Sequence, residues 1–468
     1  MDNFRYAHNP YLPETQYIPD CEPHVFKDRV YVYGSHDLPD TERYCAGSYA
    51  GWSAPVDDLS DWRYEGVLLE KGQDPYDPDG QHDYYASDAV EGADGRYYLY
   101  YSINESMVIS VAVADGPGGP FRFYGHVKDA EGHVLGADDG DDYQFDPAVL
   151  KDDDGRYYLY SGQGLPIPEM NNRKVKGSMV CELADDMMTA ITPQITITSQ
   201  FENRFEENPF FEASSIRKFG GRYYFIYSPL PNTHNLCWAV SDRPDGGFSY
   251  GGILISNADL WPDAPDELPK NYWGNNHGSV EKIGDDYFVF YHHPTNRSSF
   301  ARQGLAEKIT MTEDGRFLQA EMTSNGLYGK AYPAKGHFPA YIAWQLERSE
   351  VKPFVPFTFM EYDDKDPYIV LGENTEYVAN VTDGAEVGYR YFDFDGNVDK
   401  VTVTYRGNAE GRIRVLIDGS EVTWLETEAV SDWKIAEAAI DVKKEHAAIT
   451  FVYEGEGAVD IMEFAFEE

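Results

Sequence analysis

Five segments in the first 315 residues share one pattern of polar and hydrophobic positions. Each has a turn-forming Asp or Gly followed by a run of aromatic and β-branched residues, which predicts a hairpin leading into a half-buried strand. A repeat that holds about four short strands is typical of a β-propeller blade, so the pattern predicts five blades around a central funnel over residues 1–316. The segments start 60 to 66 residues apart: DRVYVYGSHD from Asp28, DGRYYLYYS from Asp94, DGRYYLYSG from Asp154, GGRYYFIYS from Gly220 and GDDYFVFYHH from Gly284.

The pattern changes after the fifth repeat. Residues 317–364 read as a connector of strands and loops, in which Pro333, Pro339 and Pro353 stop any helix. Residues 365–468 carry short alternating strands at a spacing of about 8–12 residues, which is typical of an antiparallel β-sandwich. The sequence therefore predicts an all-β chain, in which a five-bladed β-propeller is followed by a jelly-roll-like β-sandwich.

Length and charge narrow the possible functions. A chain of 468 residues exceeds what one hydrophobic core usually supports, so two domains are expected. With 81 acidic against 38 basic residues, the net charge is −43, which repels phosphate backbones and anionic lipids. No stretch approaches the ~18 apolar residues of a membrane span. We therefore expect neither nucleic acid nor membrane as a partner, and a neutral substrate such as a sugar fits better.

The N-terminus and the cysteines predict a location. The segment MDNFRYAHNPYLPETQYIPD has neither the basic region nor the apolar core of a signal peptide. Cys21, Cys45, Cys181 and Cys237 are scattered and form no C-x-x-C pair, which indicates free thiols in a reducing compartment. We expect a cytoplasmic protein. The sequence makes no prediction about its oligomeric state.

Candidate chemistry lies at the starts of the innermost strands. These strands converge on the propeller axis, so Glu22 in DCEPHVF, Asp146 in FDPAVL and Glu212 in FEASSI are expected to meet. Glycosidic bond hydrolysis needs two carboxyl groups, one protonated to assist the leaving group and one ionised to activate water. A third carboxylate nearby raises the pKa of the acid through like charge. Because the chain has 81 acidic residues, any one of them can equally be a solvated surface residue.

The blade segments together resemble glycoside hydrolase family 43 over about residues 8–315. That family is a five-bladed propeller that inverts the anomeric centre, and its members are mainly α-L-arabinofuranosidases, β-xylosidases and arabinanases. The resemblance implies that Glu22 is the general base, Asp146 the modulator of the acid's pKa and Glu212 the general acid. It is carried by NPYLPETQYIPDCEPHVF, YYASDAVEGADGRYYLYYS, FDPAVLKDDDGRYYLYSG, FEASSIRKFGGRYYFIYS and NNHGSVEKIGDDYFVFYHH.

Two positions depart from the family pattern. The family base is normally the Asp of a D-P dipeptide, whereas this chain has Glu22-Pro23. Asp20 is the alternative base, although Pro23 and the strand that follows align better with Glu22. The chain also has YASD, ending at Asp88, where the family often shows W-A-P-D. Asp88 is expected to line the pocket, with a purely structural role as the alternative.

Four further residues are candidates for the funnel. His277 resembles a family histidine near the axis that can help to hold a calcium ion or ordered water, and a hydrogen-bonded structural role is the alternative. Arg302 resembles a family arginine that contacts substrate hydroxyls near the modulating Asp, with a surface salt bridge as the alternative. Trp52 and Phe145 are candidates for stacking on a sugar. The resemblance thus allows a calcium ion near the axis but requires no cofactor.

The sandwich has a resemblance of its own. Residues 377–394, YVANVTDGAEVGYRYFDF, resemble the opening of a family 6 carbohydrate-binding module, with Trp424 and Trp433 available for stacking. Alternatively, the sandwich packs on the propeller and completes its pocket. Overall, the sequence predicts an inverting, exo-acting glycoside hydrolase that releases terminal α-L-arabinofuranosyl residues from plant-derived oligosaccharides. A β-xylosidase of the same family and a non-catalytic sugar-binding propeller are the alternatives.

Overall fold

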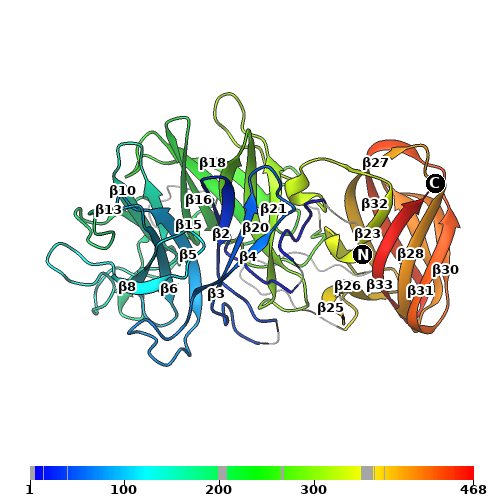
Figure 1. The fold of residues 1–468 in the computed structure, drawn as a ribbon, viewed down its shortest axis with the longest axis horizontal. Coiled ribbons are helices and arrows are strands. Elements are labelled where there is room, and N and C mark those ends of the chain that lie inside the picture. Colours follow the sequence, from blue (N-terminus) through cyan, green and yellow to red (C-terminus); the bar gives the residue numbers. More distant parts are fainter. Residues whose placement is uncertain are drawn as a thin grey trace.

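The computed structural model describes residues 6–13, 15–39, 41–198, 208–264, 268–348, 362, 364–373 and 375–467. Two β domains lie next to each other along the long axis of the molecule, a propeller in blue to green and a sandwich in orange to red (Figure 1). The prediction of an all-β chain is confirmed. Two short 3₁₀ turns are described, η2 (Gly326–Tyr328) after the last propeller strand and η3 (Ala340–Ile342) between strands β23 (Gly336–Pro339) and β24 (Gln345–Glu347). Among the described residues, no helix is long and apolar enough to cross a membrane.

Each blade of the propeller is an antiparallel sheet. Blade 1 contains β1 (Glu22–Phe26), β2 (Arg29–Tyr33), β3 (Tyr49–Pro55) and β4 (Arg63–Leu69). Blade 2 contains β5 (Tyr84–Glu91), β6 (Tyr97–Ile103), β7 (Ile109–Ala114) and β8 (Arg122–His126). Blade 3 contains β9 (Ala148–Lys151), β10 (Tyr157–Gln163), β13 (Gly177–Leu183) and β14 (Ile195–Thr196). A small hairpin, β11 (Glu169–Met170) and β12 (Arg173–Lys174), projects between β10 and β13.

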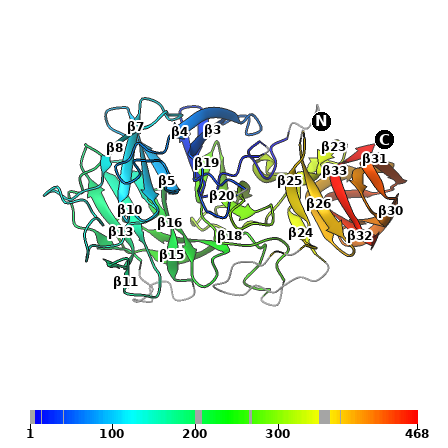
Figure 2. The same cartoon turned by 90° about the horizontal axis from the view of Figure 1, so that it is seen from below.

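Blades 4 and 5 complete the ring. Blade 4 contains β15 (Phe210–Phe219), β16 (Arg222–Pro229), β17 (Asn235–Ser241) and β18 (Ser249–Ser256). Within the described residues, blade 5 has three strands, β19 (Ser279–Ile283), β20 (Asp286–Pro294) and β21 (Arg302–Ile309). The first strands of the five blades, β1, β5, β9, β15 and β19, contact one another in a closed inner ring. Figure 2 shows the blades following one another in sequence order around the axis.

The aromatic repeat forms the second strand of every blade. In β6, Tyr98 and Tyr100 pack against β10 of the next blade, whereas Leu99 and Tyr101 pack against blade 1. Because successive side chains of a strand point to opposite faces, an aromatic run without polar positions suits a sheet covered on both sides. Gly95, with a φ of 78°, makes the turn that precedes β6. The repeat therefore predicted the strands, but the half-buried strand expected from it is corrected, because every residue of β6 and β10 is buried between neighbouring blades.

The ring is closed by residues that precede the first blade. Cys21 forms a parallel β-bridge with Gly278, which joins blade 1 to blade 5. The N–H of Tyr11 donates to the carbonyl of Gly304 in β21 at 3.3 Å. The Asn9 side chain donates to the carbonyl of Ala306 at 3.0 Å and accepts from its N–H at 2.9 Å. The N-terminal segment thus fastens the last blade to the first.

The C-terminal domain is a sandwich of two six-stranded sheets around one core. One sheet contains β22 (Tyr332–Pro333), β24 (Gln345–Glu347), β27 (Glu386–Asp395), β29 (Glu410–Ile417), β30 (Ser420–Thr427) and β32 (Lys443–Glu456). The other contains β23 (Gly336–Pro339), β25 (Tyr368–Leu371), β26 (Glu376–Thr382), β28 (Lys400–Gly407), β31 (Val430–Ala439) and β33 (Ala458–Glu467). The predicted sandwich is therefore present.

The predicted boundary between connector and sandwich needs correction. Residues 332–347, placed in the connector over 317–364, supply β22, β23 and β24 to the sandwich sheets. The prolines that suggested a connector end β22 and β23, where a missing N–H costs no ladder hydrogen bond. Residues 349–361 and 363 of the predicted connector lie outside the described residues.

Buried polar contacts hold the sandwich to the propeller. Arg390 of β27 donates to Asp259, which follows β18, at 2.8 Å. Its guanidinium also lies 3.6 Å from the ring centre of Trp344, which packs into the core shared by blades 4 and 5. Trp433 packs instead against Tyr377 and Arg406 within the sandwich, while Trp424 on β30 is 47% exposed. Packing on the propeller, the alternative role considered for this domain, is therefore observed.

Candidate active site

A cavity of about 650 Å³, here called the axial cavity, opens where the inner strands begin. Its lining includes charged and titratable side chains from remote parts of the chain, among them Asp20, Asp146, Glu212, His277 and Arg302. Asp20 precedes β1, Asp146 precedes β9 and Glu212 lies in β15, so three blades each supply one carboxyl group. The propeller thus gathers acids that are far apart in sequence onto one axis.

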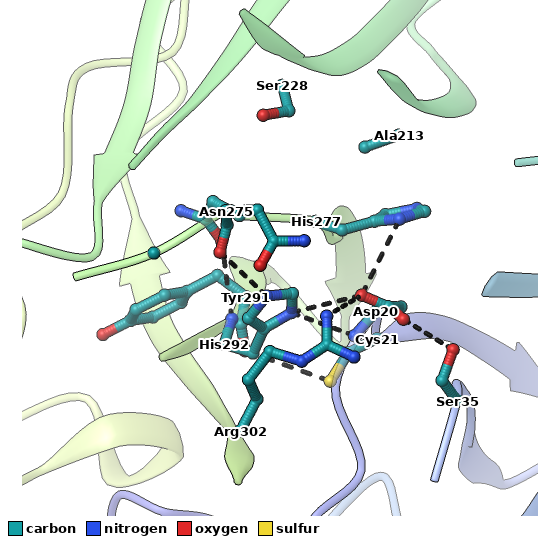
Figure 3. A network of polar contacts seen from close by, with 12 residues as sticks. Asp20, Cys21, Ser35, Ala213, Ser228, Asn275, His277, Tyr291, His292 and Arg302 are labelled. Atoms are coloured by element: carbon teal, nitrogen blue, oxygen red, sulfur yellow. Dashed lines mark hydrogen bonds and ion pairs between the residues drawn. The ribbon is translucent and has the colours of Figure 1, made fainter. Parts of the chain in front are cut away.

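Asp20 is held by donors on several sides (Figure 3). Arg302 Nη1 lies 3.2 Å from Asp20 Oδ1, and the Ser35 hydroxyl donates to Oδ2 at 2.5 Å. The backbone N–H of Asp20 donates to His292 Nδ1 at 3.0 Å. Burial by itself would raise the pKa of Asp20, but the positive charge of Arg302, with smaller contributions from the neighbouring histidines and the Ser35 hydrogen bond, lowers it to about 2. Asp20 is therefore an ionised carboxylate over the whole working range of pH.

Arg302 is fixed in place by residues that sequence reasoning missed. Its Nε and Nη2 donate to the two oxygens of Asp37 at 2.8 and 2.9 Å, and its guanidinium lies 4.7 Å from the ring centre of Tyr44. The sequence feature that could have pointed to Asp37 is its place at the end of the first repeat, DRVYVYGSHD. Arg302 lines the axial cavity as predicted for a substrate-binding residue, but it forms ion pairs with Asp20 and Asp37 rather than with Asp146.

Glu212 is directed into the cavity by an irregularity in its strand. The pairing of β15 with β16 shifts register on both sides of Glu212, and the next residue, Ala213, has a φ of 66°. The N–H of Ala213 donates to Asp146 Oδ2 at 2.9 Å, while Gln163 Nε2 donates to Glu212 Oε2 at 3.2 Å. Burial raises the pKa of Glu212 to about 7, with Asp20 contributing through like charge. Glu212 thus keeps its proton near neutral pH.

Asp146 shares the electrostatic environment of Glu212. Burial, followed by the negative charges of Glu212 and Asp20, raises the pKa of Asp146 well above its usual range.

Asp20, Asp146 and Ala213 also have positive φ values of 58°, 43° and 66°. Such backbone conformations cost a non-glycine residue about 1–3 kcal/mol each and cluster at functional sites. The surrounding structure therefore holds these three positions in a specific, strained geometry.

His277 sits between two of the carboxyl groups. Its Nδ1 lies 3.9 Å from Asp20 Oδ1 and 3.8 Å from Asp146 Oδ2. Burial lowers the pKa of His277 to about 4, so the ring is neutral near pH 7. A neutral imidazole between two carboxyl groups can act as a hydrogen-bond donor to either of them or to a bound hydroxyl.

Glu22, the predicted base, does not line the axial cavity, so this assignment is corrected. Its side chain is 1% exposed, with Oε2 accepting from Arg217 Nη2 at 2.8 Å and from the Ser215 hydroxyl at 3.1 Å. Asp20 precedes β1 with a φ of 58°, whereas Glu22 is the first residue of β1 and accepts from Arg217 and Ser215. Asp20 therefore meets the cavity, and Glu22 lies in the layer beneath it.

The same depth separation applies to other inner strands. His277 and Ser279 lie two residues apart, as do Asp20 and Glu22. The Ser215 hydroxyl joins the two deeper residues, because it lies 3.1 Å from Glu22 Oε2 and 2.8 Å from the Ser279 hydroxyl. We call the deeper set the axial layer. Its members are Glu22, Asp88, Ser215, Arg217 and Ser279.

Three further predictions have mixed outcomes. Phe145 lines the axial cavity as predicted and packs against Tyr85, with ring centres 5.7 Å apart. Trp52 does not reach the cavity, because its side chain packs against Tyr64 and the core between blades 1 and 5. Asp88 is fully buried in the axial layer, so its alternative structural role is the one observed.

Comparisons with known proteins agree with this geometry. Residues 52–317 match the family model of glycosyl hydrolases family 43. A protein from Thermoclostridium stercorarium named xylosidase/arabinosidase is 43% identical over 469 aligned residues, which cover 97% of this chain and 98% of that protein. The chain belongs to glycosyl hydrolases family 43.

Solved structures support the architecture of this family 43 enzyme. A β-xylosidase/α-arabinofuranosidase from a compost microbial metagenome, solved with xylotriose, is 26% identical with a TM-score of 0.53 and covers 68% of this chain and 98% of its own. An arabinoxylan arabinofuranohydrolase from Bacillus subtilis covers 98% of this chain and 97% of its own, at 20% identity and a TM-score of 0.53. The second likeness, which shows the fold alone, spans both domains.

The family resemblance allows a calcium ion on the axis, and one cluster of possible ligands there does not fit such an ion. Within the described residues, Glu22, His24 and Asp88 place possible ligand atoms within 4.8 Å of one another. However, Arg217 and Ser215 donate to Glu22, while His24 Nε2 lies 2.5 Å from Asp88 Oδ1 and the N–H of Val149 donates to Oδ2 at 2.7 Å. A buried guanidinium beside the carboxylates already supplies the positive charge that a cation would bring. His277, the predicted metal ligand, lies outside this group.

Proposed function

We propose that this family 43 hydrolase is an inverting, exo-acting glycosidase that releases terminal α-L-arabinofuranosyl residues from plant-derived oligosaccharides. Release of terminal β-xylosyl residues by the same site is the second candidate, and it is favoured by the name xylosidase/arabinosidase of relatives from Thermoclostridium stercorarium and Bacteroides ovatus. An oligosaccharide substrate is further supported by the family 43 neighbour solved with xylotriose. The net charge of −43 disfavours anionic ligands.

The opposite protonation states of two cavity acids carry this proposal. Asp20, ionised beside Arg302, deprotonates a water molecule on one face of the sugar. Glu212, which keeps its proton near neutral pH, donates that proton to the departing oxygen. Attack and departure then occur on opposite faces in a single displacement, which inverts the anomeric configuration. Asp146 accepts from the N–H of Ala213 and so fixes the backbone beside the acid, while the negative charge of Asp20 helps burial to raise the pKa of Glu212.

The exo mode is supported by the closed lower end of the axial cavity. Beneath Asp20 and His277, the axial layer fills the propeller axis with buried side chains joined by hydrogen bonds. With its floor closed by the axial layer, the axial cavity can receive the end of a chain from its mouth, and an exo mode is part of this proposal. The expected product is therefore a monosaccharide.

A substrate screen tests the proposed function. Aryl glycosides of α-L-arabinofuranose, β-D-xylopyranose and β-D-galactopyranose are incubated with the enzyme, and the first two are expected to be hydrolysed. Proton NMR of the freshly released sugar should show the anomer opposite to that of the substrate. Retention of the anomer would contradict the inverting mechanism. Binding of the sugars without any hydrolysis would instead favour a non-catalytic propeller.

The pKa values of the two acids predict an unusual pH profile. Since Glu212 must be protonated and its pKa is about 7, kcat/KM should fall about tenfold per pH unit above that value. Asp20, with a pKa of about 2, stays ionised, so no acidic limb is expected between pH 4 and 6. The measurement is kcat/KM from pH 4 to 9.

A matched variant checks this assignment of the alkaline limb. Gln163 donates to Glu212 and thereby favours its ionised form, so Gln163→Ala should move the alkaline limb to higher pH. If the alkaline limb of the variant lies at the same pH as that of the wild type, the limb reports the titration of a group other than Glu212.

We infer that the enzyme needs no calcium ion on its axis, because Arg217 occupies that role. Dialysis against EDTA should leave the melting temperature and kcat unchanged, and metal analysis of the purified protein should find no stoichiometric calcium. Arg217→Met, which leaves Glu22 buried without its partner, should destabilise the fold by about 3–5 kcal/mol. A fall in melting temperature on EDTA treatment, restored by calcium, would refute the inference.

A further inference from the structure

One wall of the axial cavity extends outward from the proposed general acid. Gln163, the last residue of β10, donates to Glu212, and the N–H of Gly164 donates to the carbonyl of Phe211 at 2.6 Å. The next residue, Leu165, lines the cavity. The loop after β10 thus starts at the acid and runs along the cavity wall. Because a general acid protonates the departing oxygen, the leaving group must lie on this side.

The wall continues through the β11–β12 hairpin. Met170 and Asn171, at its tip, line the cavity, and so does Met107 in the turn between β6 and β7. The Asn171 side-chain amide donates to Met107 Sδ at 3.7 Å, which joins the turn of blade 2 to the hairpin of blade 3. Two segments from different blades therefore form one continuous surface, here called the methionine wall: Met107, Leu165, Met170 and Asn171.

The backbone of the methionine wall is braced from behind. Arg173 Nε donates to the carbonyl of Gly136 at 3.0 Å, and its Nη1 donates to Asp139 at 3.2 Å. The N–H of Lys174 donates to the carbonyl of Asp141 at 2.7 Å, and the N–H of Val175 donates to that of Pro168 at 2.9 Å. A fixed backbone that presents unbranched methionine side chains combines a defined position with an adaptable contact surface.

The chemistry of the wall suits a neutral sugar ring. Its apolar side chains can cover the C–H face of a pyranose, while Asn171 and the nearby Asn104, which also lines the cavity, can bond hydroxyl groups. Ile167, in the same loop, is a further apolar side chain that is 39% exposed. Glu105, also in the lining, disfavours an anionic leaving group.

We propose that the methionine wall is the subsite for the leaving group, and that it binds a neutral saccharide of the xylan type. This inference rests on the proposed function, since it takes Glu212 as the acid. The charged residues at the start of the inner strands bind the terminal pentose, and the methionine wall determines which chain that pentose is removed from.

The test compares two substrates of the same pentose. One is an oligosaccharide, xylotriose or arabinosyl-xylotriose, and the other is the glycosyl fluoride, whose leaving group is too small to touch the wall. In Met107→Ala/Met170→Ala, the ratio of kcat/KM for the oligosaccharide to kcat/KM for the fluoride should fall at least tenfold. Ile195→Ala, an exposed position on β14 of the same blade, is the matched control and should leave the ratio unchanged.

The outcomes separate this inference from the proposed function. If the wild-type enzyme hydrolyses both substrates and the ratio is the same in the double variant, the methionine wall is not the subsite, although the enzyme is a pentosidase. If the wild-type enzyme hydrolyses neither substrate, the proposed function fails and the subsite fails with it. A lower ratio that Met107→Leu/Met170→Leu restores supports the inference, because leucine returns apolar contact area without the sulfur atoms.

Discussion

Replacing Asp20 with Asn should reduce kcat on natural oligosaccharides by about 10²–10⁴-fold, the usual contribution of a general base. Asparagine keeps the size of the side chain and can still contact Arg302 and Ser35, but it cannot take a proton from water. The fold should therefore be retained. Circular dichroism and the melting temperature check the fold, and initial rates of sugar release check the activity.

Glu22→Gln is the decisive comparison for the base. Glu22 lies beneath the cavity and pairs with Arg217, so its substitution should lower the melting temperature while leaving kcat close to that of the wild type. The reverse result, with Asp20→Asn active and Glu22→Gln inactive, would return the base to Glu22. In Asp20→Ala, added azide should restore turnover by attacking the anomeric carbon in place of water, and the product should be a glycosyl azide of inverted configuration.

Replacing Glu212 with Gln should reduce kcat on oligosaccharides by a similar factor of about 10²–10⁴, because no proton reaches the departing oxygen. The size of the loss should depend on the leaving group. A 2,4-dinitrophenyl glycoside leaves as a stable anion and needs no protonation, so its hydrolysis should be reduced far less. The measurement is kcat for both substrates with the wild-type enzyme and the variant.

This dependence on the leaving group distinguishes an acid from a residue that only supports the cavity. Asp37→Asn is a suitable control, because Asp37 accepts two hydrogen bonds from Arg302 and does not line the axial cavity. It should weaken hydrolysis of the oligosaccharide and of the activated glycoside by the same factor. If Glu212→Gln lowers kcat by the same factor on both substrates, Glu212 is not the general acid.

The sequence alone predicted the five blades and the sandwich, but not the strands that residues 332–347 add to the sandwich. The aromatic run in each repeat needs cover on both faces, and β6 shows this with Tyr98 packed toward one neighbouring blade and Tyr101 toward the other. The sequence also predicted that acidic residues at the starts of the inner strands meet on the axis, and Asp146 and Glu212 both line the axial cavity. Both predictions depend on the residue types within each repeat and on the arrangement of similar sheets around one axis.

The tertiary structure decided which acid faces the substrate. Asp20 and Glu22 lie two residues apart, so the sequence cannot decide which of them faces the substrate. Only the structure shows that Asp20 lines the axial cavity and that Glu22 does not. Arg217, from β15 and 195 residues away in sequence, pairs with Glu22, whereas Arg302, 282 residues away, contacts Asp20. Trp52 is buried by the neighbouring blade in the same way. The sequence determined a ring of five sheets with acids at its centre, and the long-range packing determined the depth, partner and charge of each acid.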